Sequence, residues 1–161
     1  MAILKQIRRI CLRVMALTPS TMLALSTPLP GFDLPQVTGG RLNSQSLDHR
    51  PLLLMVLCAH CPFVKHVEPE LTRLEHDFGD QVQLVGVSSN SLITHPQDGP
   101  EQLADQARRL GWSFPYLLDE QQNLAKALQA ACTPEFYLFS PDSKGLQPLR
   151  YRGQLDGSRP G

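Results

Sequence analysis

The chain of 161 residues is long enough to form one domain with a substantial hydrophobic core. Hydrophobic residues make up 42% of it and charged residues 19%, which excludes an intrinsically disordered protein and is typical of a soluble globular one. Because the formal net charge is zero, the composition gives no reason to expect nucleic acid as a partner.

The first fourteen residues form a basic amphipathic segment with four basic residues and no acidic one. Its apolar residues fall on one stripe of a helix, namely Ile3, Ile7, Ile10 and Val14. We therefore divide the chain into an extension, residues 1–14, and a domain over residues 15–161. A start assigned too early, with Met15 as the true initiator, would also explain the extension.

The N-terminal region does not have the pattern of a membrane span or a signal peptide. No apolar run is long enough to cross a bilayer. Arg13 and the polar run from Thr18 to Thr21 interrupt the apolar stretch, and no small-x-small cleavage site follows. We therefore expect a cytoplasmic protein without a membrane partner.

The sequence of the first half of the domain predicts a hairpin, two strands and a helix. Alternating apolar residues on both sides of Gly39-Gly40 predict a hairpin over residues 32–47. The apolar runs Leu52–Leu57 and Val82–Val87 read as buried strands. Between them, helical spacing predicts a helix from Pro62 to Phe78, with Pro69 expected to kink it.

The second half continues the alternation of helices and strands. Gly99-Pro100 begins a helix that Gly111 ends. The remaining elements are a short strand, a helix and two final strands, predicted at Phe114–Leu118, Leu124–Ala131, Glu135–Phe139 and Leu149–Arg152. Together these elements predict an α/β domain with one sheet.

The motif Cys58-Ala59-His60-Cys61 lies between a predicted strand and a predicted helix. Free N–H groups and the positive end of the helix dipole stabilise a thiolate at such a junction, and a thiolate attacks disulfides and peroxides. We assign Cys58 as the attacking thiol, because we expect it to lie nearer the helix start and to be more exposed, and Cys61 as the resolving thiol. His60 either stabilises the thiolate or accepts a proton, or it is a solvated turn residue.

The four cysteines, at positions 11, 58, 61 and 132, are too few and too scattered for a disulfide scaffold. Cys132 is either a small buried core residue or a third thiol able to exchange with the pair. The polar residues Asn90, His95 and Asp98 are most simply turn formers and a helix cap.

The order of strand, C-x-x-C and kinked helix resembles the thioredoxin fold. Cys132-Thr133-Pro134, directly before a predicted strand, supports this resemblance, because thioredoxin-like proteins place a cis-proline there, facing the C-x-x-C. The resemblance therefore implies that Thr133 and Pro134 belong to the site beside Cys58, His60 and Cys61.

More specifically, the chain is similar to the peroxiredoxin-like, AhpC/TSA-related branch of that superfamily, over roughly residues 16–161. Four stretches carry the similarity: Cys58–His66, Asn90–Pro100, Ala131–Phe139 and Tyr151–Pro160. It implies a thioredoxin-like fold with a central mixed sheet flanked by helices, an N-terminal hairpin and a redox-active disulfide. We expect no cofactor and no metal. A protein or small-molecule disulfide, or a peroxide, would be the substrate, and a thiol would be the reductant.

The chain departs from the peroxiredoxin pattern in two respects. A peroxiredoxin has a threonine three residues before its peroxidatic cysteine, and if Cys61 takes that role, Cys58 stands where the threonine should be. Either Arg150 or Arg152 would have to replace the usual arginine. We therefore expect weak peroxidase activity.

The fold implied by the resemblance normally closes with a C-terminal helix. The chain stops at Gly161, so we expect that helix to be missing and part of one sheet face to need cover. A second copy, as a homodimer, or the apolar stripe of residues 1–14 would provide such cover.

Three functions therefore remain open. The first is a thiol–disulfide oxidoreductase, and the second is a thiol peroxidase with antioxidant activity that uses Cys61. The third is a non-enzymatic module that holds zinc through Cys58, Cys61, His60 and Cys132, which is disfavoured because only one C-x-x-C is present.

Overall fold

The computed structural model describes residues 20–155, so the stripe of residues 1–14, and Cys11 with it, lies outside the described residues. Five strands form the central sheet in the order β5-β4-β3-β6-β7. Their bounds are Leu52–Val56 for β3, Gln83–Ser88 for β4, Tyr116–Leu118 for β5, Glu135–Phe139 for β6 and Leu149–Gly153 for β7. Strands β3, β4 and β5 run parallel, and β6 and β7 are antiparallel to their neighbours, so the predicted mixed sheet is confirmed.

Strand β3 is buried on both faces because its side chains alternate between two hydrophobic clusters. Leu52, Leu54 and Val56 belong to one cluster, which also contains Tyr137 and Phe139 of β6. Its other side chains enter a second cluster: Met55 is fully buried there, and Leu53 packs against it. An almost continuously apolar strand is what a sheet with both faces covered requires.

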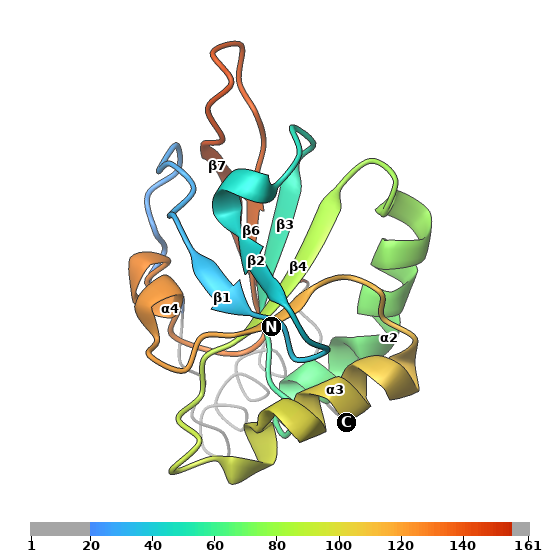
Figure 1. Ribbon diagram of the computed structural model, residues 1–161. Helices are drawn as coiled ribbons and strands as arrows, with labels where there is room; N and C mark the ends of the chain where they lie inside the picture. The colour runs from blue at the N-terminus through green and yellow to red at the C-terminus, as the bar shows by residue number, and fades with distance from the viewer. Residues whose placement is uncertain (1–19, 156–161) are drawn as a thin grey trace, which may run out of the picture.

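Two helices cover the face of the sheet that carries Met55 (Figure 1). Helix α2 spans Pro62–Phe78 and α3 spans Pro100–Leu110, and each contributes a row of side chains to the second cluster. Gly111 ends α3 in the left-handed conformation, at φ 70°, which glycine adopts without a steric penalty. None of the helices in the described part of the chain is long and apolar enough to cross a membrane.

The opposite face is covered by the N-terminal hairpin and a short helix (Figure 1). Strands β1 (Asp33–Pro35) and β2 (Arg41–Asn43) pair antiparallel, followed by the 3₁₀ turn η1 (Ser44–Ser46). Helix α4, Asn123–Ala127, adds Leu124 to the same cluster. The hairpin and the helices on both faces confirm the predicted fold class.

Three expected details were wrong. The last helix ends at Ala127 instead of Ala131, because Gln129 takes a positive φ of 53° that cannot continue a helix. The strand expected from Phe114 begins at Tyr116, after Pro115, which has no N–H to donate to a ladder. The helical spacing of apolar residues also predicts Phe78 in the core, but it is the last residue of α2 and is 47% exposed.

Replacement of Leu54 by alanine should destabilise the protein, because its side chain is fully buried in the middle of β3. We expect the free energy of unfolding to fall by about 2–5 kcal/mol, measured by chemical denaturation. Ile93→Ala is the matched control: this side chain is 93% exposed, and the change should stay within about 0.5 kcal/mol. A loss below about 1 kcal/mol for Leu54→Ala would contradict the packing described here.

Candidate functional site

The sheet register brings three separate segments to one edge of the molecule. Val56, the last residue of β3, lies opposite Val87 of the parallel strand β4 and opposite Glu135, the first residue of β6. The segments that follow β3 and β4 therefore meet the segment that precedes β6. They carry the C-x-x-C, the loop that contains Asp98, and Thr133-Pro134 respectively.

The two cysteines of the motif occupy different environments. Cys58 is fully buried, whereas Cys61 is half-buried and is the N-cap residue of α2. The expectation that Cys58 is nearer the helix start and more exposed was therefore wrong. Pro62 occupies the first position of the helix, and the free N–H groups of the first turn consequently face Cys61. Both thiols are free in this structure.

Thr133 contacts both sulfurs. Its hydroxyl oxygen lies 3.3 Å from Cys58 Sγ, and its carbonyl oxygen lies 3.5 Å from Cys61 Sγ. The Thr133–Pro134 peptide bond is cis, as the resemblance to thioredoxin-like proteins implied. Thr133 therefore forms one wall of the site, opposite the C-x-x-C turn.

The two thiols differ in pKa, which is lowered for Cys61 and raised for Cys58. The hydrogen bond from the Cys58 thiol is the largest effect on Cys61 and, with the N–H groups of Val64 and Phe63, lowers the pKa of Cys61 to about 5 against the opposing effect of burial. The same hydrogen bond, followed by burial, raises the pKa of Cys58 far above its ordinary value. The hydrogen bond between the two sulfurs therefore favours ionisation of Cys61 and keeps the proton on Cys58.

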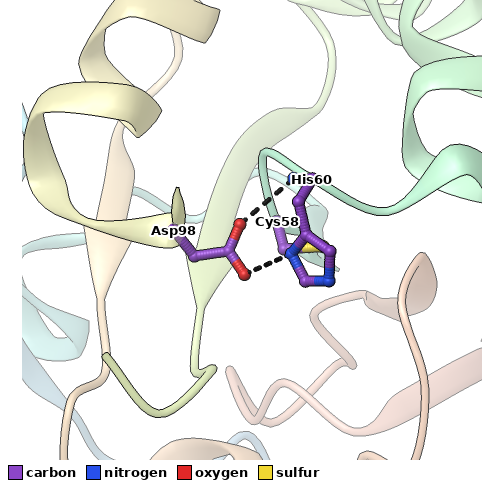
Figure 2. A group of neighbouring side chains, drawn as sticks. All are labelled: Cys58, His60 and Asp98. Atoms are coloured by element: carbon purple, nitrogen blue, oxygen red, sulfur yellow. Dashed lines mark hydrogen bonds and ion pairs between the residues drawn. The ribbon is translucent and has the colours of Figure 1, made fainter. Parts of the chain in front are cut away.

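The buried carboxylate of Asp98 is hydrogen-bonded to the turn between the cysteines (Figure 2). Asp98 comes from the loop between β4 and α3, where it ends the 3₁₀ turn η2 (Pro96–Asp98), and it is fully buried. Its Oδ1 accepts the backbone N–H groups of Ala59 at 2.8 Å and His60 at 3.1 Å. Its Oδ2 lies 2.6 Å from His60 Nδ1 and accepts Asn90 Nδ2 at 2.7 Å.

These contacts change the role expected for Asp98. It does not cap α3, whose N-cap is Gly99 and has no side-chain hydrogen bond. Burial alone would raise the pKa of Asp98, but hydrogen bonds from Asn90, Ala59 and His60 outweigh it and lower that pKa. The side chain is therefore an anion. Its place in one of the stretches similar to the AhpC/TSA-related branch was the available signal for a role beyond turn formation.

A second polar network supports the backbone of Cys58 from below. Gln106 of α3 donates to the Cys58 carbonyl oxygen at 3.2 Å and to Glu68 Oε1 at 2.9 Å. It accepts the Tyr116 hydroxyl at 3.1 Å, and Arg109 lies 3.1 Å from the second Glu68 oxygen. The buried groups of Glu68, Gln106 and Tyr116 satisfy one another, and together with the exposed Arg109 they join α2, α3 and β5 next to the cysteine.

Cys132 stands beside a different carboxylate. Its Sγ lies 3.9 Å from Glu135 Oε2, and Glu135 is fully buried. Burial first, and the charge of Glu135 second, raise the pKa of Cys132 to about 11. This thiol is therefore protonated at neutral pH, which disfavours it as an attacking group.

Cys58, His60 and Asp98 each offer one atom that could bind a metal, all within 4.8 Å of one another (Figure 2). Sulfur, imidazole nitrogen and carboxylate oxygen together suit zinc. However, the four hydrogen bonds that Asp98 accepts already occupy both of its oxygens. A metal ion would have to break the contact between Asp98 and His60, so the geometry favours the hydrogen-bonded arrangement.

Comparison with known proteins supports the resemblance found in the sequence. The profile described as the AhpC/TSA family matches residues 25–145. An uncharacterized conserved protein from Geobacillus kaustophilus is 42% identical, with 91% of this chain and 77% of that protein covered and a TM-score of 0.83. A hypothetical protein from Sinorhizobium meliloti 1021 is 33% identical, with 89% and 78% covered and a TM-score of 0.83.

A more distant structure shares the fold alone. A secreted disulfide oxidoreductase from Mycobacterium tuberculosis is 17% identical, with 74% of this chain and 81% of that protein covered and a TM-score of 0.61. None of the curated proteins compared with this chain matches it significantly.

Removal of the hydrogen-bond donor at Cys58 should raise the pKa of Cys61, since that hydrogen bond is the largest effect lowering it. We expect Cys58→Ala to shift the pKa of Cys61 toward the ordinary thiol value of about 8.5. Cys58→Ser keeps an O–H donor and should shift it less. The rate of iodoacetamide alkylation against pH, followed on the Cys61 peptide by mass spectrometry, measures both. Equal midpoints in the wild-type protein and Cys58→Ala would contradict the assignment.

Proposed function

This chain belongs to the AhpC/TSA family, and from that premise we propose that it is a thiol–disulfide oxidoreductase in which Cys61 attacks and Cys58 resolves. The observation that carries the proposal is the pair of free sulfurs at the N-terminus of α2, with Thr133 against both. The roles of the two cysteines are the reverse of those expected from the sequence, because Cys61 is the more exposed and the more acidic.

The proposed reaction has two exchange steps. In the first, the Cys61 thiolate attacks a substrate disulfide, a mixed disulfide forms, and one substrate sulfur leaves as a thiolate. In the second, Cys58 loses its proton and attacks Cys61 Sγ, and the second substrate sulfur is released. The protein ends with a Cys58–Cys61 disulfide, the substrate has gained two electrons, and an external thiol reductant restores the free pair.

A protein disulfide or a small-molecule disulfide would serve as the substrate. Cys61 is half-buried and lies beyond the C-terminal end of the central strand β3, so the substrate sulfur must approach the surface beside Thr133. The carbonyl oxygen of Thr133 lies against Cys61 Sγ and would turn toward an extended substrate chain, which pairs through backbone hydrogen bonds.

The alternative is a thiol peroxidase that uses Cys61. One observation in its favour is the low pKa of that thiol. From the strand register we infer that neither expected residue supplies the arginine that a peroxidase needs beside its thiolate. Arg152 pairs with Tyr137, whose side chain belongs to the cluster on the face opposite Cys58. Arg150 follows Leu149, which pairs with Phe139 near the start of β3, and Cys58 follows the other end of that strand.

Trapping with a model disulfide tests the proposed roles. After reaction with oxidised glutathione, the wild-type protein should lose two hydrogens and contain a Cys58–Cys61 disulfide. Cys58→Ala should instead retain one glutathione on Cys61, because no resolving thiol is available, and Cys61→Ala should not react. Intact-protein and peptide mass spectrometry distinguish these products. Cys132→Ala is the matched control and should behave as the wild-type protein does. Stable glutathione on Cys58 in Cys61→Ala would refute the assigned order.

Reaction with hydrogen peroxide separates the two functions. We expect Cys61 to be oxidised slowly. Position 58 is a cysteine instead of the threonine that would orient the peroxide, and we do not expect Arg150 or Arg152 beside Cys61. Stopped-flow measurement of the wild-type protein, with a disulfide and with peroxide at equal concentrations, gives both rate constants. A peroxide rate constant above the disulfide rate constant would make the peroxidase the preferred function.

A further inference from the structure

We propose that His60 accepts the proton of Cys58 during the resolving step, and that Asp98 positions the His60 ring for this purpose. The inference rests on the proposed function and adds to it a route for the proton. Neither residue is needed for the first exchange step, in which Cys61 already reacts as a thiolate. The proposal therefore concerns the second step alone.

The second step needs a proton acceptor. Cys58 is fully buried, and its hydrogen bond to Cys61 and its burial keep it protonated. Once Cys61 is bonded to a substrate sulfur it is no longer an anion, and it cannot draw the proton from Cys58. A thiol attacks disulfides poorly compared with a thiolate, so a base must be close enough to remove this proton.

His60 and Asp98 provide that base (Figure 2). A ring nitrogen of His60, a carboxylate oxygen of Asp98 and Cys58 Sγ all lie within 4.8 Å of one another. Water that is hydrogen-bonded at about 2.8 Å to each neighbour can bridge Cys58 Sγ and the ring nitrogen of His60 that does not contact Asp98. The His60 side chain is 34% exposed, so water reaches it without any opening of the core.

The Asp98 carboxylate determines which nitrogen is basic. An ionised carboxylate only accepts hydrogen bonds, so the 2.6 Å contact requires that His60 Nδ1 carries the proton. Nε2 of the neutral ring is then free to accept a second proton. The resulting imidazolium lies beside the Asp98 anion.

Other groups around the ring support one orientation. His95, from the same loop as Asp98, stacks on His60 with ring centroids 5.0 Å apart and an interplanar angle of 22°. Cys58 and Cys61 approach from the turn that carries His60, and Asn90 holds the second lone pair of Asp98 Oδ2. Tyr116 of β5 is fully buried near Cys58 and Asp98, and burial first and those two groups second raise its pKa, so it stays a neutral phenol.

The step balances in atoms and electrons. The Cys58 proton passes to His60 Nε2 through the water, and a bond forms between Cys58 Sγ and Cys61 Sγ. The bond between Cys61 and the substrate sulfur breaks, and the departing thiolate takes the proton from the imidazolium. Two protein thiols are oxidised to one disulfide while the substrate disulfide is reduced to two thiols, so no further oxidant is needed.

His60→Gln tests the proposal in a single turnover. Glutamine keeps a polar side chain at a partly exposed position but cannot take the proton. With oxidised glutathione and rapid acid quenching, mass spectrometry separates formation of the mixed disulfide from its closure. We expect formation to change less than about twofold, and closure at pH 7 to slow by at least about a hundredfold, as is typical for loss of a general base.

The pH profile separates proton transfer from a structural effect. Closure in His60→Gln should rise about tenfold per pH unit, because only spontaneously ionised Cys58 then reacts, and should approach the wild-type rate at high pH. Added imidazole should partly restore closure at pH 7. Asp98→Asn should slow closure with the same pH dependence as His60→Gln. His76→Gln is the matched control and should close at the wild-type rate, because the His76 side chain is 87% exposed in the last turn of α2.

The outcomes distinguish this inference from the proposed function. If the wild-type protein forms no mixed disulfide on Cys61, the oxidoreductase proposal fails. If the mixed disulfide forms and His60→Gln closes it at the wild-type rate, the role of His60 is refuted while the oxidoreductase proposal stands. A closure defect in His60→Gln that neither high pH nor imidazole relieves would also refute proton transfer. If Asp98→Asn does not fold, the His60→Gln profile still decides.

Discussion

The carboxylate of Asp98 is the contact on which the redox site depends. A C-x-x-C turn presents backbone N–H groups that the helix cannot use, because they precede its first turn. Asp98 accepts two of them, from Ala59 and His60, and binds the His60 ring as well. A buried anion is stable only when its lone pairs are satisfied, and here all four contacts come from the protein. The loop between β4 and α3 thereby sets the geometry of the turn after β3.

Local sequence patterns predicted the frame of the protein well, for physical reasons. The apolar run Leu52–Leu57 and the helical spacing after Pro62 reflect burial that each segment experiences by itself. Pro62 also indicated where α2 begins, and a proline at the first helical position implies that the preceding residue, Cys61, is the cap. The expectation of an exposed Cys58 gave too little weight to this signal.

The contacts made by Asp98 could not be predicted in the same way. It lies 38 residues from His60 in the chain, within a loop that has no periodicity to place it. Only the pairing of β3 with β4 brings that loop beside the turn. Gln106 of α3 likewise donates to the Cys58 carbonyl oxygen, because α3 packs on the face of the sheet that carries Cys58. Such interactions depend on the completed fold, and local patterns do not contain them.

The burial of β3 on both faces has a consequence for how the site fluctuates. This strand is hydrogen-bonded to β4 on one side and to β6 on the other, and its side chains fill both clusters. Amide groups in such a strand exchange with solvent only through global unfolding, whereas loops open locally at a much smaller free energy. The buried sulfur of Cys58 therefore lies two residues beyond a strand that opens only at a high free energy. Adaptation to differently shaped partners must come from the segments facing it, the loop of Asp98 and the turn before β6.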